Sequence, residues 1–233
     1  VSARKAFVRL EKIMSFYSDF TPTQLPKPQP SISVEQVNYA FPNQKEPKIK
    51  NLNFKVEPGE IICITGPSAA GKTTICKLLL GIIKPSNGHV RLDHAEISQW
   101  DKFDIGNHVG YLPQNIELMM GTVRENIARM QKDVDDQLII EAAKLAGVHE
   151  IILKLPNGYE TNVGSNGQLL SAGQRQRIGL ARAFFNSPGF VVLDEPNSNL
   201  DQEGDQALAD ALLKAKENKT TVIVISHRKA IYD

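Results

Sequence analysis

The sequence predicts an α/β fold built around a parallel β-sheet, and three observations carry this prediction. Residues 60–65 form an apolar run that leads directly into a glycine-bearing loop and then a helical segment. Residues 190–193 and 220–225 form two further apolar runs, separated by a helical segment that begins near Asp201. Short continuous apolar runs are typical of strands covered on both faces, as in parallel sheets.

Composition limits the classes of protein to which the chain can belong. Its 233 residues can bury a substantial core, and its 27 Lys and Arg residues nearly balance its 26 Asp and Glu residues. No whole-chain field favours nucleic acid, so we expect no nucleic-acid partner. No apolar stretch is long enough to cross a bilayer, and no signal peptide is visible. Because the chain begins with Val1 rather than Met, we expect it to be part of a longer protein.

The first 30 residues are predicted to differ from the remainder. Apolar residues recur at helical spacing among charged ones, at Phe7, Leu10, Met14 and Tyr17. This pattern predicts an amphipathic helix that ends at Thr21-Pro22, although an ordinary surface helix fits the periodicity equally well. Four prolines between residues 22 and 30 then predict a stiff linker. We therefore divide the chain into residues 1–30 and a domain of residues 31–233.

The domain is predicted to begin with strands and to continue into helices. Alternating residues 32–37 and 49–56 predict half-buried strands, and residues 72–80 predict a helix that Gly81 stops. Capping boxes open further helices at residues 122 and 171, another helix spans 136–146, and Pro156 closes one more. Cys63 and Cys76 lie in apolar segments without Cys-x-x-Cys spacing, which favours two buried thiols over a bridge.

Residues 66–73 fit the phosphate-loop pattern G-x-x-x-x-G-K-[ST]. A triphosphate needs oriented backbone N–H groups, which a glycine-bearing loop and a helix N-terminus supply. The Lys72 ammonium can bind the β- and γ-phosphates, and the Thr73 hydroxyl can bind Mg²⁺. The sequence therefore predicts ATP and Mg²⁺ as cofactors. The predicted nucleotide-binding residues of this segment are Gly66, Pro67, Ser68, Ala69, Ala70, Gly71, Lys72, Thr73 and Thr74.

Two acidic residues follow the second apolar run. Asp194 ends the predicted strand, where a carboxylate can hold Mg²⁺ beside the loop. Glu195 follows immediately and can accept a proton from the attacking water. Alone, the pair would be read as solvated acids at a strand end. After a phosphate loop, it predicts a metal ligand and a catalytic base.

His227 and Gln114 also follow apolar stretches. Because ligands bind at the carboxyl ends of parallel strands, His227 is predicted to contact the γ-phosphate. The Gln114 amide can reach Mg²⁺ or the attacking water. Histidines are more often structural, and Gln114 would be unremarkable without the other motifs. We predict catalytic roles for both, together with Lys72, and a metal contact for Gln114.

Residues 170–174, which we call the serine turn, raise a geometric question. Ser171 and Gly173 open a helix and so create another anion site, although the loop at 66–73 already surrounds the phosphates. The serine turn is either a capped helix start or a cover for the γ-phosphate held by a neighbouring molecule. The residues alone leave both possibilities open.

The order of these motifs resembles the nucleotide-binding domain of ABC transporters, from about Ile32 to the end of the chain. The likeness rests on residues 66–73, 114, 170–174, 191–195, 198–201 and 227. It implies a head-to-tail dimer in which Ser171, Gly173 and Gln174 of one copy cover ATP on the other. It further implies adenine stacking on Phe41, with Tyr39 as the alternative, and Asp201 as a bridge between the two sites. Glu195 would be the base, and His227 would sense the γ-phosphate.

Finer features resemble the exporter branch, and in particular type I secretion ATPases that export proteases and lipases. They lie at residues 91–93, 110–114, 121–127, 158–164 and 195–201. The resemblance implies a P-loop NTPase core with a parallel sheet, an N-terminal antiparallel β subdomain and an inserted helical subdomain at about 115–186. Residues 1–30 would continue from a transmembrane domain that residues 158–164 touch.

The same resemblance implies partners and a location. The partners are a second copy of the chain, its transmembrane domain, a periplasmic adaptor, an outer-membrane channel and a secreted protein. The location is the cytoplasmic face of the inner membrane. Alternatives are an exporter of lipids or drugs, and a soluble ABC ATPase that acts on nucleic acid.

Two positions depart from the family pattern. Ala172 replaces the first glycine of Leu-Ser-Gly-Gly-Gln, and its methyl group is expected to cost about 1 kcal/mol if a glycine-only conformation is needed there. Ser165-Asn166 stands where exporters often carry an acidic residue, which bears on the coupling to a membrane domain.

Overall fold

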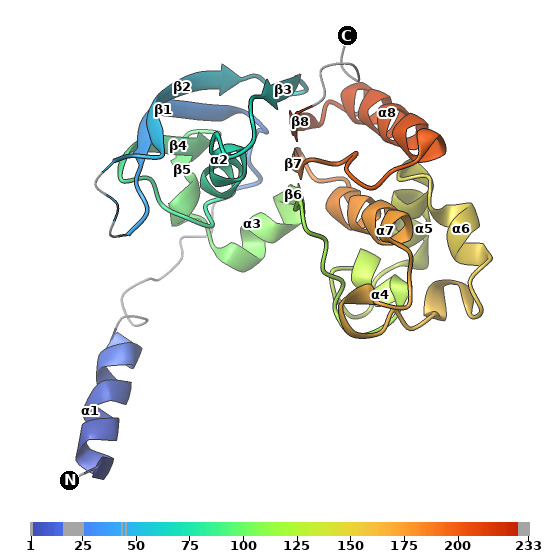
Figure 1. Cartoon of the computed structure of the whole chain (residues 1–233), viewed down its shortest axis with the longest axis horizontal. Helices are drawn as coiled ribbons and strands as arrows, with labels where there is room; N and C mark the ends of the chain where they lie inside the picture. The colour runs from blue at the N-terminus through green and yellow to red at the C-terminus, as the bar shows by residue number, and fades with distance from the viewer. Residues whose placement is uncertain (1, 16–25, 43, 45, 228–233) are drawn as a thin grey trace.

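Two four-stranded sheets organise the chain (Figure 1), of which the computed structural model describes residues 2–15, 26–42, 44 and 46–227. The antiparallel sheet has the order β2-β1-β4-β5 and contains β1 (Ile32–Tyr39), β2 (Ile49–Val56), β4 (Asn87–Leu92) and β5 (Ala95–Glu96). The parallel sheet has the order β3-β8-β7-β6 and contains β3 (Ile61–Thr65), β6 (Val109–Leu112), β7 (Phe190–Asp194) and β8 (Thr221–Ser226). The predicted α/β fold with a parallel sheet and an N-terminal antiparallel part is confirmed.

The helices follow the predicted order. They are α1 (Ser2–Ser15), α2 (Lys72–Leu79), α3 (Lys102–His108), α4 (Val123–Ile127), α5 (Asp136–Leu145), α6 (His149–Leu153), α7 (Ala172–Phe184) and α8 (Gln202–Glu217). Short 3₁₀ turns lie at Ile97–Gln99, Gly158–Glu160 and Ser165–Gly167. Both predicted capping boxes are confirmed, Thr122 with Glu125 before α4 and Ser171 with Gln174 before α7.

The continuous apolar pattern of the central strands arises because they serve two cores. Val191 and Leu193 of β7 face a core that includes α4, α5, α7 and α8. Phe190 and Val192 face a second core formed with α2 and the antiparallel sheet. Every residue of β7 and β8 is buried, as predicted for strands covered on both faces. The same prediction is wrong for β3, which is mostly half-buried because it is the edge strand of the sheet.

The helical insertion shares the first of these cores with the parallel sheet. Ile127 of α4, Ile139 of α5 and Ile178 of α7 pack in the same buried cluster as Leu193 of β7. α7 lies between the other inserted helices and the sheet, so it contacts both α4 and α5 on one side and β6 on the other (Figure 1). The boundaries proposed for this subdomain, about 115–186, stay a prediction.

The N-terminal part matches its predicted helix in type. The described side chains of α1, including Phe7 and Leu10, are exposed. The predicted end at Thr21-Pro22, like Tyr17, lies outside the described residues. Further along, the Gln29 N–H donates to the Asp93 carboxylate at 3.3 Å, which ties this segment to the antiparallel sheet. No helix in the described part of the chain has the length and apolar character needed to cross a membrane.

Three elements have no counterpart among the predictions, namely β4, β5 and α3. They are short, and their apolar residues follow no sustained period. Cys63 and Cys76 are free, as expected.

Candidate active site

The four strands of the parallel sheet end at one edge, and each leads into a predicted motif. β3 leads into residues 66–74, β6 into Gln114, β7 into Glu195 and β8 into His227. The parallel registers of β3, β8, β7 and β6 place these strand ends side by side. Motifs that are distant in sequence therefore meet where ligands bind in parallel α/β sheets.

A cavity of about 260 Å³ lies at this edge and gathers half of the predicted site residues. It contains residues of the phosphate loop, both predicted metal-binding side chains outside that loop, and the predicted base. Its lining consists of Lys48, Ser68, Ala69, Gly71, Lys72, Thr73, Thr74, Gln114, Asp194 and Glu195.

The phosphate loop is folded back on its own lysine. Lys72 Nζ donates to the carbonyl oxygens of Gly66 at 2.8 Å and Pro67 at 3.1 Å. Gly71 precedes α2 with φ +101°, and a Cβ on it would lie 2.8 Å from Ile49 Cδ1, so glycine is required there. Ala69 is also left-handed, with φ +63°. Gly66, Pro67 and Ala70 shape this loop without lining the cavity.

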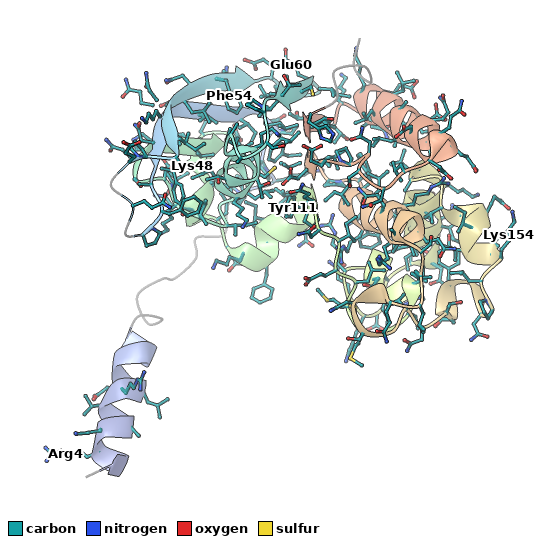
Figure 2. All side chains as sticks on the ribbon, in the orientation of Figure 1. Arg4, Lys48, Phe54, Glu60, Tyr111 and Lys154 are labelled. Atoms are coloured by element: carbon teal, nitrogen blue, oxygen red, sulfur yellow. The ribbon has the colours of Figure 1, made fainter. Side chains whose placement is uncertain are left out.

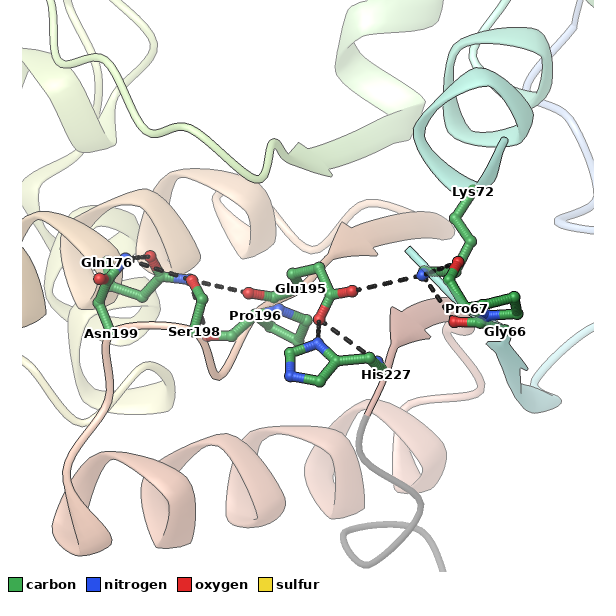
Figure 3. A network of polar contacts seen from close by, with 9 residues as sticks. All are labelled: Gly66, Pro67, Lys72, Gln176, Glu195, Pro196, Ser198, Asn199 and His227. Carbon is green, nitrogen blue, oxygen red and sulfur yellow. Dashed lines mark hydrogen bonds and ion pairs between the residues drawn. The ribbon is translucent and has the colours of Figure 1, made fainter. Parts of the chain in front are cut away.

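Glu195 occupies the centre of a polar network (Figure 3). Its Oε2 lies 2.6 Å from His227 Nδ1, and its Oε1 lies 3.9 Å from Lys72 Nζ. The Glu195 backbone has φ +53°, and its N–H donates to the Ile225 carbonyl oxygen at 2.8 Å. A left-handed non-glycine residue costs about 1–3 kcal/mol and persists only where neighbours hold it, which is common at functional sites.

Asp194 fits the role of a metal ligand. It is 1% exposed, and neither carboxylate oxygen has a hydrogen bond of regular geometry among the described residues, although the Thr73 hydroxyl and the Cys76 thiol lie close to it. Burial raises the pKa of Asp194 above its ordinary value. A divalent cation would satisfy both oxygens, and the side-chain oxygens of Thr73 and Gln114 on the same cavity suit Mg²⁺. The described residues contain no cluster of three or more His, Cys, Asp or Glu that would hold a metal otherwise.

The serine turn lies apart from this cavity in the single chain. Ser171 caps α7: its hydroxyl accepts from the Gln174 N–H at 3.2 Å, and Gln174 Oε1 accepts from the Ser171 N–H at 2.8 Å. Ser171 is exposed, and a Cβ on Gly173 would lie 3.3 Å from the Asn199 carbonyl oxygen. Ala172 is the first residue of α7 and is not left-handed, so the expected strain at this position is absent.

Phe41 and Asp201 also lie outside the cavity lining. The Phe41 ring is 39% exposed and meets the Tyr39 ring edge-on, with 5.3 Å between centroids. Asp201 caps α8, where its Oδ1 accepts from the Gly204 N–H at 2.8 Å and from Arg177 Nη2 at 2.6 Å. These bonds lower the pKa of Asp201, the Gly204 N–H foremost.

Lys48 is a cavity residue that sequence reasoning missed. It lies on the connection between β1 and β2 (Figure 2), and its Nζ donates to the Ala69 carbonyl oxygen of the phosphate loop. No motif marks it, because only the packing of the antiparallel sheet against the loop places it there. Gln176, a buried amide behind Glu195, was missed for the same reason.

Comparisons with known proteins agree with this arrangement. Residues 49–198 match the ABC transporter family. The type I secretion system ATP-binding protein PrsD of Rhizobium meliloti (strain 1021) is 44% identical over 229 residues, which cover 98% of this chain and 39% of that protein. The ATP-dependent lipid A-core flippase of Chromobacterium violaceum is 36% identical over 204 residues, which cover 88% of this chain and 35% of that protein.

A solved structure supports the same fold. The structure of a bacterial Atm1-family ABC exporter with ATP bound matches with a TM-score of 0.85 at 27% identity, covering 98% of this chain and 41% of that chain. The chain thus spans less than half the length of each of these relatives.

Proposed function

The chain belongs to the ABC transporter family, and on that premise we propose that it hydrolyses ATP to power the export of a protein across a membrane. Members of the family couple ATP hydrolysis to transport. The observation that carries the proposal is the single cavity in which the phosphate loop, Gln114, Asp194 and Glu195 meet. A binding site for phosphates, an unpaired acid and a held base are the parts that phosphoryl transfer to water requires.

We give each side chain a role that its position supports. The loop N–H groups and Lys72 would bind the phosphates, while Asp194, Thr73 and Gln114 would hold Mg²⁺, which would neutralise charge on the phosphate oxygens. His227 engages Glu195 Oε2 at 2.6 Å, so Glu195 Oε1, on the side of Lys72, is the oxygen we assign to the attacking water. His227 would thereby orient the base and sense the γ-phosphate. Gln114, which follows the neighbouring strand β6 at the same edge of the sheet, would position the water.

A second copy of the chain completes the site in this proposal. The cavity of about 260 Å³ is smaller than the roughly 300–1,000 Å³ of typical ligand pockets, and Ser171 of the serine turn stands exposed outside it. Head-to-tail pairing would bring Ser171, Gly173 and Gln174 of one copy over the nucleotide of the other. Phe41 would stack on the adenine, and Asp201 would lie between the two sites.

Purified domain tests this mechanism. ATPase activity should rise faster than linearly with protein concentration, because two copies form each site. Glu195→Gln should bind ATP without turnover and accumulate as a dimer by size-exclusion chromatography with light scattering. Glu217→Gln, on an exposed residue at the end of α8, is the matched control and should behave as the wild type. Activity strictly proportional to concentration, with a monomeric Glu195→Gln variant, would contradict the dimer.

The cargo and the membrane partners belong to the same proposal. Likeness at 44% to a type I secretion protein, against 36% to a lipid flippase, supports a protein cargo. If the cargo is a protein, we also propose a periplasmic adaptor and an outer-membrane channel as partners. The domain would then act at the cytoplasmic face of the inner membrane. Residues 1–30 would lead from a transmembrane domain into the ATPase domain at 31–233. Exposed Met119 and Met130 line a cavity of about 420 Å³, and together with the neighbouring exposed Met120 they offer that domain an apolar surface.

The cargo can be tested in vesicles that contain the longer protein to which this domain belongs. An unfolded secreted protein should stimulate ATP hydrolysis, and lipid A should have no effect. Stimulation by lipid A alone would favour the lipid exporter instead.

A further inference from the structure

Gln176 is a buried amide that connects α7 to the segment containing the proposed base. It is 1% exposed, and its Nε2 donates to the Pro196 carbonyl oxygen at 2.7 Å, with the Glu195 carbonyl oxygen at 3.5 Å. Its Oε1 lies 3.5 Å from Asn199 Nδ2 (Figure 3). All of these partners lie on the segment that follows β7. Both polar atoms of the Gln176 amide therefore contact the same five-residue stretch, 195–199.

The Glu195 backbone depends on such contacts. Its left-handed conformation is unfavourable for a side chain of this size, so surrounding bonds must hold it. The Ile225 carbonyl oxygen accepts its N–H, and the Ser198 N–H donates to its carbonyl oxygen at 3.2 Å. Gln176 supplies the described side-chain hydrogen bonds from α7 to the backbone of Glu195 and Pro196. A shift of α7 is therefore felt directly at the base.

The same helix begins at the serine turn. α7 is a continuous helix of 13 residues from Ala172, capped by Ser171. A helix rises about 1.5 Å per residue, so Gln176 stands about 7.5 Å along the axis from Ser171 within one rigid segment. Movement of the serine turn must move Gln176 with it. One end of α7 faces the site of the proposed partner copy, while Gln176 contacts the base of its own site.

We propose that Gln176 is a positioning residue that carries the docking of the serine turn, on the nucleotide of the partner copy, to Glu195 in its own site. This inference rests on the proposed function, because it requires the head-to-tail pair. It adds a defined connection between the two ATP sites of the pair. Misplacement of a catalytic group by about 1 Å can cost on the order of 100-fold in rate, so a single displaced amide suffices.

Gln176→Met tests the connection, because methionine preserves length and burial but donates no hydrogen bond. Asn126→Leu is the matched control: Asn126 is also 1% exposed, and its Nδ2 donates to the Met119 and Thr122 carbonyl oxygens at 2.9 Å each, on α4. Both variants remove a buried amide held by backbone groups. Only Gln176→Met removes one beside the base.

The readouts separate positioning from stability. For Gln176→Met we expect kcat to fall by at least about tenfold and the Hill coefficient for ATP to fall toward 1. Binding of a fluorescent ATP analogue to the monomer, and ATP-driven dimerisation in the Glu195→Gln background, should stay within about threefold of the control values. Asn126→Leu should lower the unfolding free energy comparably and keep kcat within about twofold.

A second variant keeps the test decisive if Gln176→Met folds poorly. Gln176→Glu retains the length and an acceptor, but its carboxylate cannot donate to the Pro196 carbonyl oxygen. Burial raises the pKa of such a carboxyl group, so protonation restores the donor as the pH falls. Its kcat relative to the wild type should therefore rise with decreasing pH.

Two outcomes would overturn the role of Gln176. One is a kcat of Gln176→Met within twofold of the wild type. The other is a loss of activity that only follows loss of dimer or of folded protein in both the Gln176 and the Asn126 variants. The ATPase activity and the ATP-driven dimer of the wild type are measured before any variant. Absence of either would contradict the proposed function rather than the role of Gln176.

Discussion

Replacing Arg129 by Met should destabilise the domain by about 3–5 kcal/mol. Arg129 follows α4, and its partly buried guanidinium donates to carbonyl oxygens at the ends of two other helices. The acceptors within 3.2 Å are those of Gly106, Val109, Arg182 and Ala183. The described residues include no carboxylate paired with it. One cation therefore closes the carboxyl ends of α3 and α7 and joins them to α4.

Two opposing terms set the magnitude. Burial lowers the pKa of Arg129 from 12.5 to about 10, which opposes the charged form by about 3 kcal/mol at about 1.4 kcal/mol per pH unit. Hydrogen bonds from a charged donor contribute about 1.5–3 kcal/mol each. With four carbonyl oxygens within 3.2 Å, even the lower end of this range outweighs the burial cost by about 3 kcal/mol. Methionine fills the space but leaves these carbonyl groups without their donor.

Urea unfolding of the nucleotide-free domain measures the loss. Arg124→Met is the control, because Arg124 lies nearby in α4 itself, yet its partner Asp136, at 2.6 Å, is 73% exposed, so this pair is worth about 1 kcal/mol or less. In thermal unfolding, Arg129→Met should lower Tm by roughly 6–20 °C for a chain of this size. If Arg129→Met loses no more stability than Arg124→Met, the carbonyl contacts do not carry the energy assigned to them.

Three further substitutions follow from the site. Ala172→Gly should lower the unfolding free energy by up to about 1 kcal/mol and change kcat less than about twofold, because Ala172 already has helical backbone; a large gain in ATPase rate would refute this. Asp194→Asn should stabilise the metal-free domain by about 1–3 kcal/mol near neutral pH, since it removes a buried carboxylate without a partner. The folded pKa of Asp194 is raised, so this gain should be small in acid and grow as the pH rises through that pKa; a gain independent of pH in urea unfolding would contradict it. Lys48→Met should raise KM for ATP about threefold to tenfold with kcat unchanged, whereas Lys50→Met on the exposed side of β2 should leave both constants alone in steady-state kinetics.

The motifs with local structure could be read from the sequence. The phosphate loop joins a strand to a helix within a few residues, so its pattern alone predicts both its conformation and its ligand. The capping boxes at Thr122 and Ser171 are likewise local and were confirmed. Gly71 illustrates the same point, because the pattern places glycine at the position that has a left-handed backbone. The expectation of strain at Ala172 was wrong. The family pattern has glycine at this position, but the start of α7 does not require a glycine-only conformation there.

What the amino-acid order predicted on its own was a set of candidate reacting groups: a loop for phosphates, an acid for a metal and a base beside it, each marked by the residues next to it in the sequence. What only the tertiary structure decided was which side chains support them. Lys48, beside the antiparallel sheet, contacts the loop that follows β3 of the parallel sheet. Gln176 of α7 contacts the segment of the proposed base, and Arg129 binds the last carbonyl groups of helices far from it in the chain. Such contacts depend on the relative placement of whole helices and strands. The local sequence around a lysine, glutamine or arginine does not distinguish these side chains from ordinary surface residues.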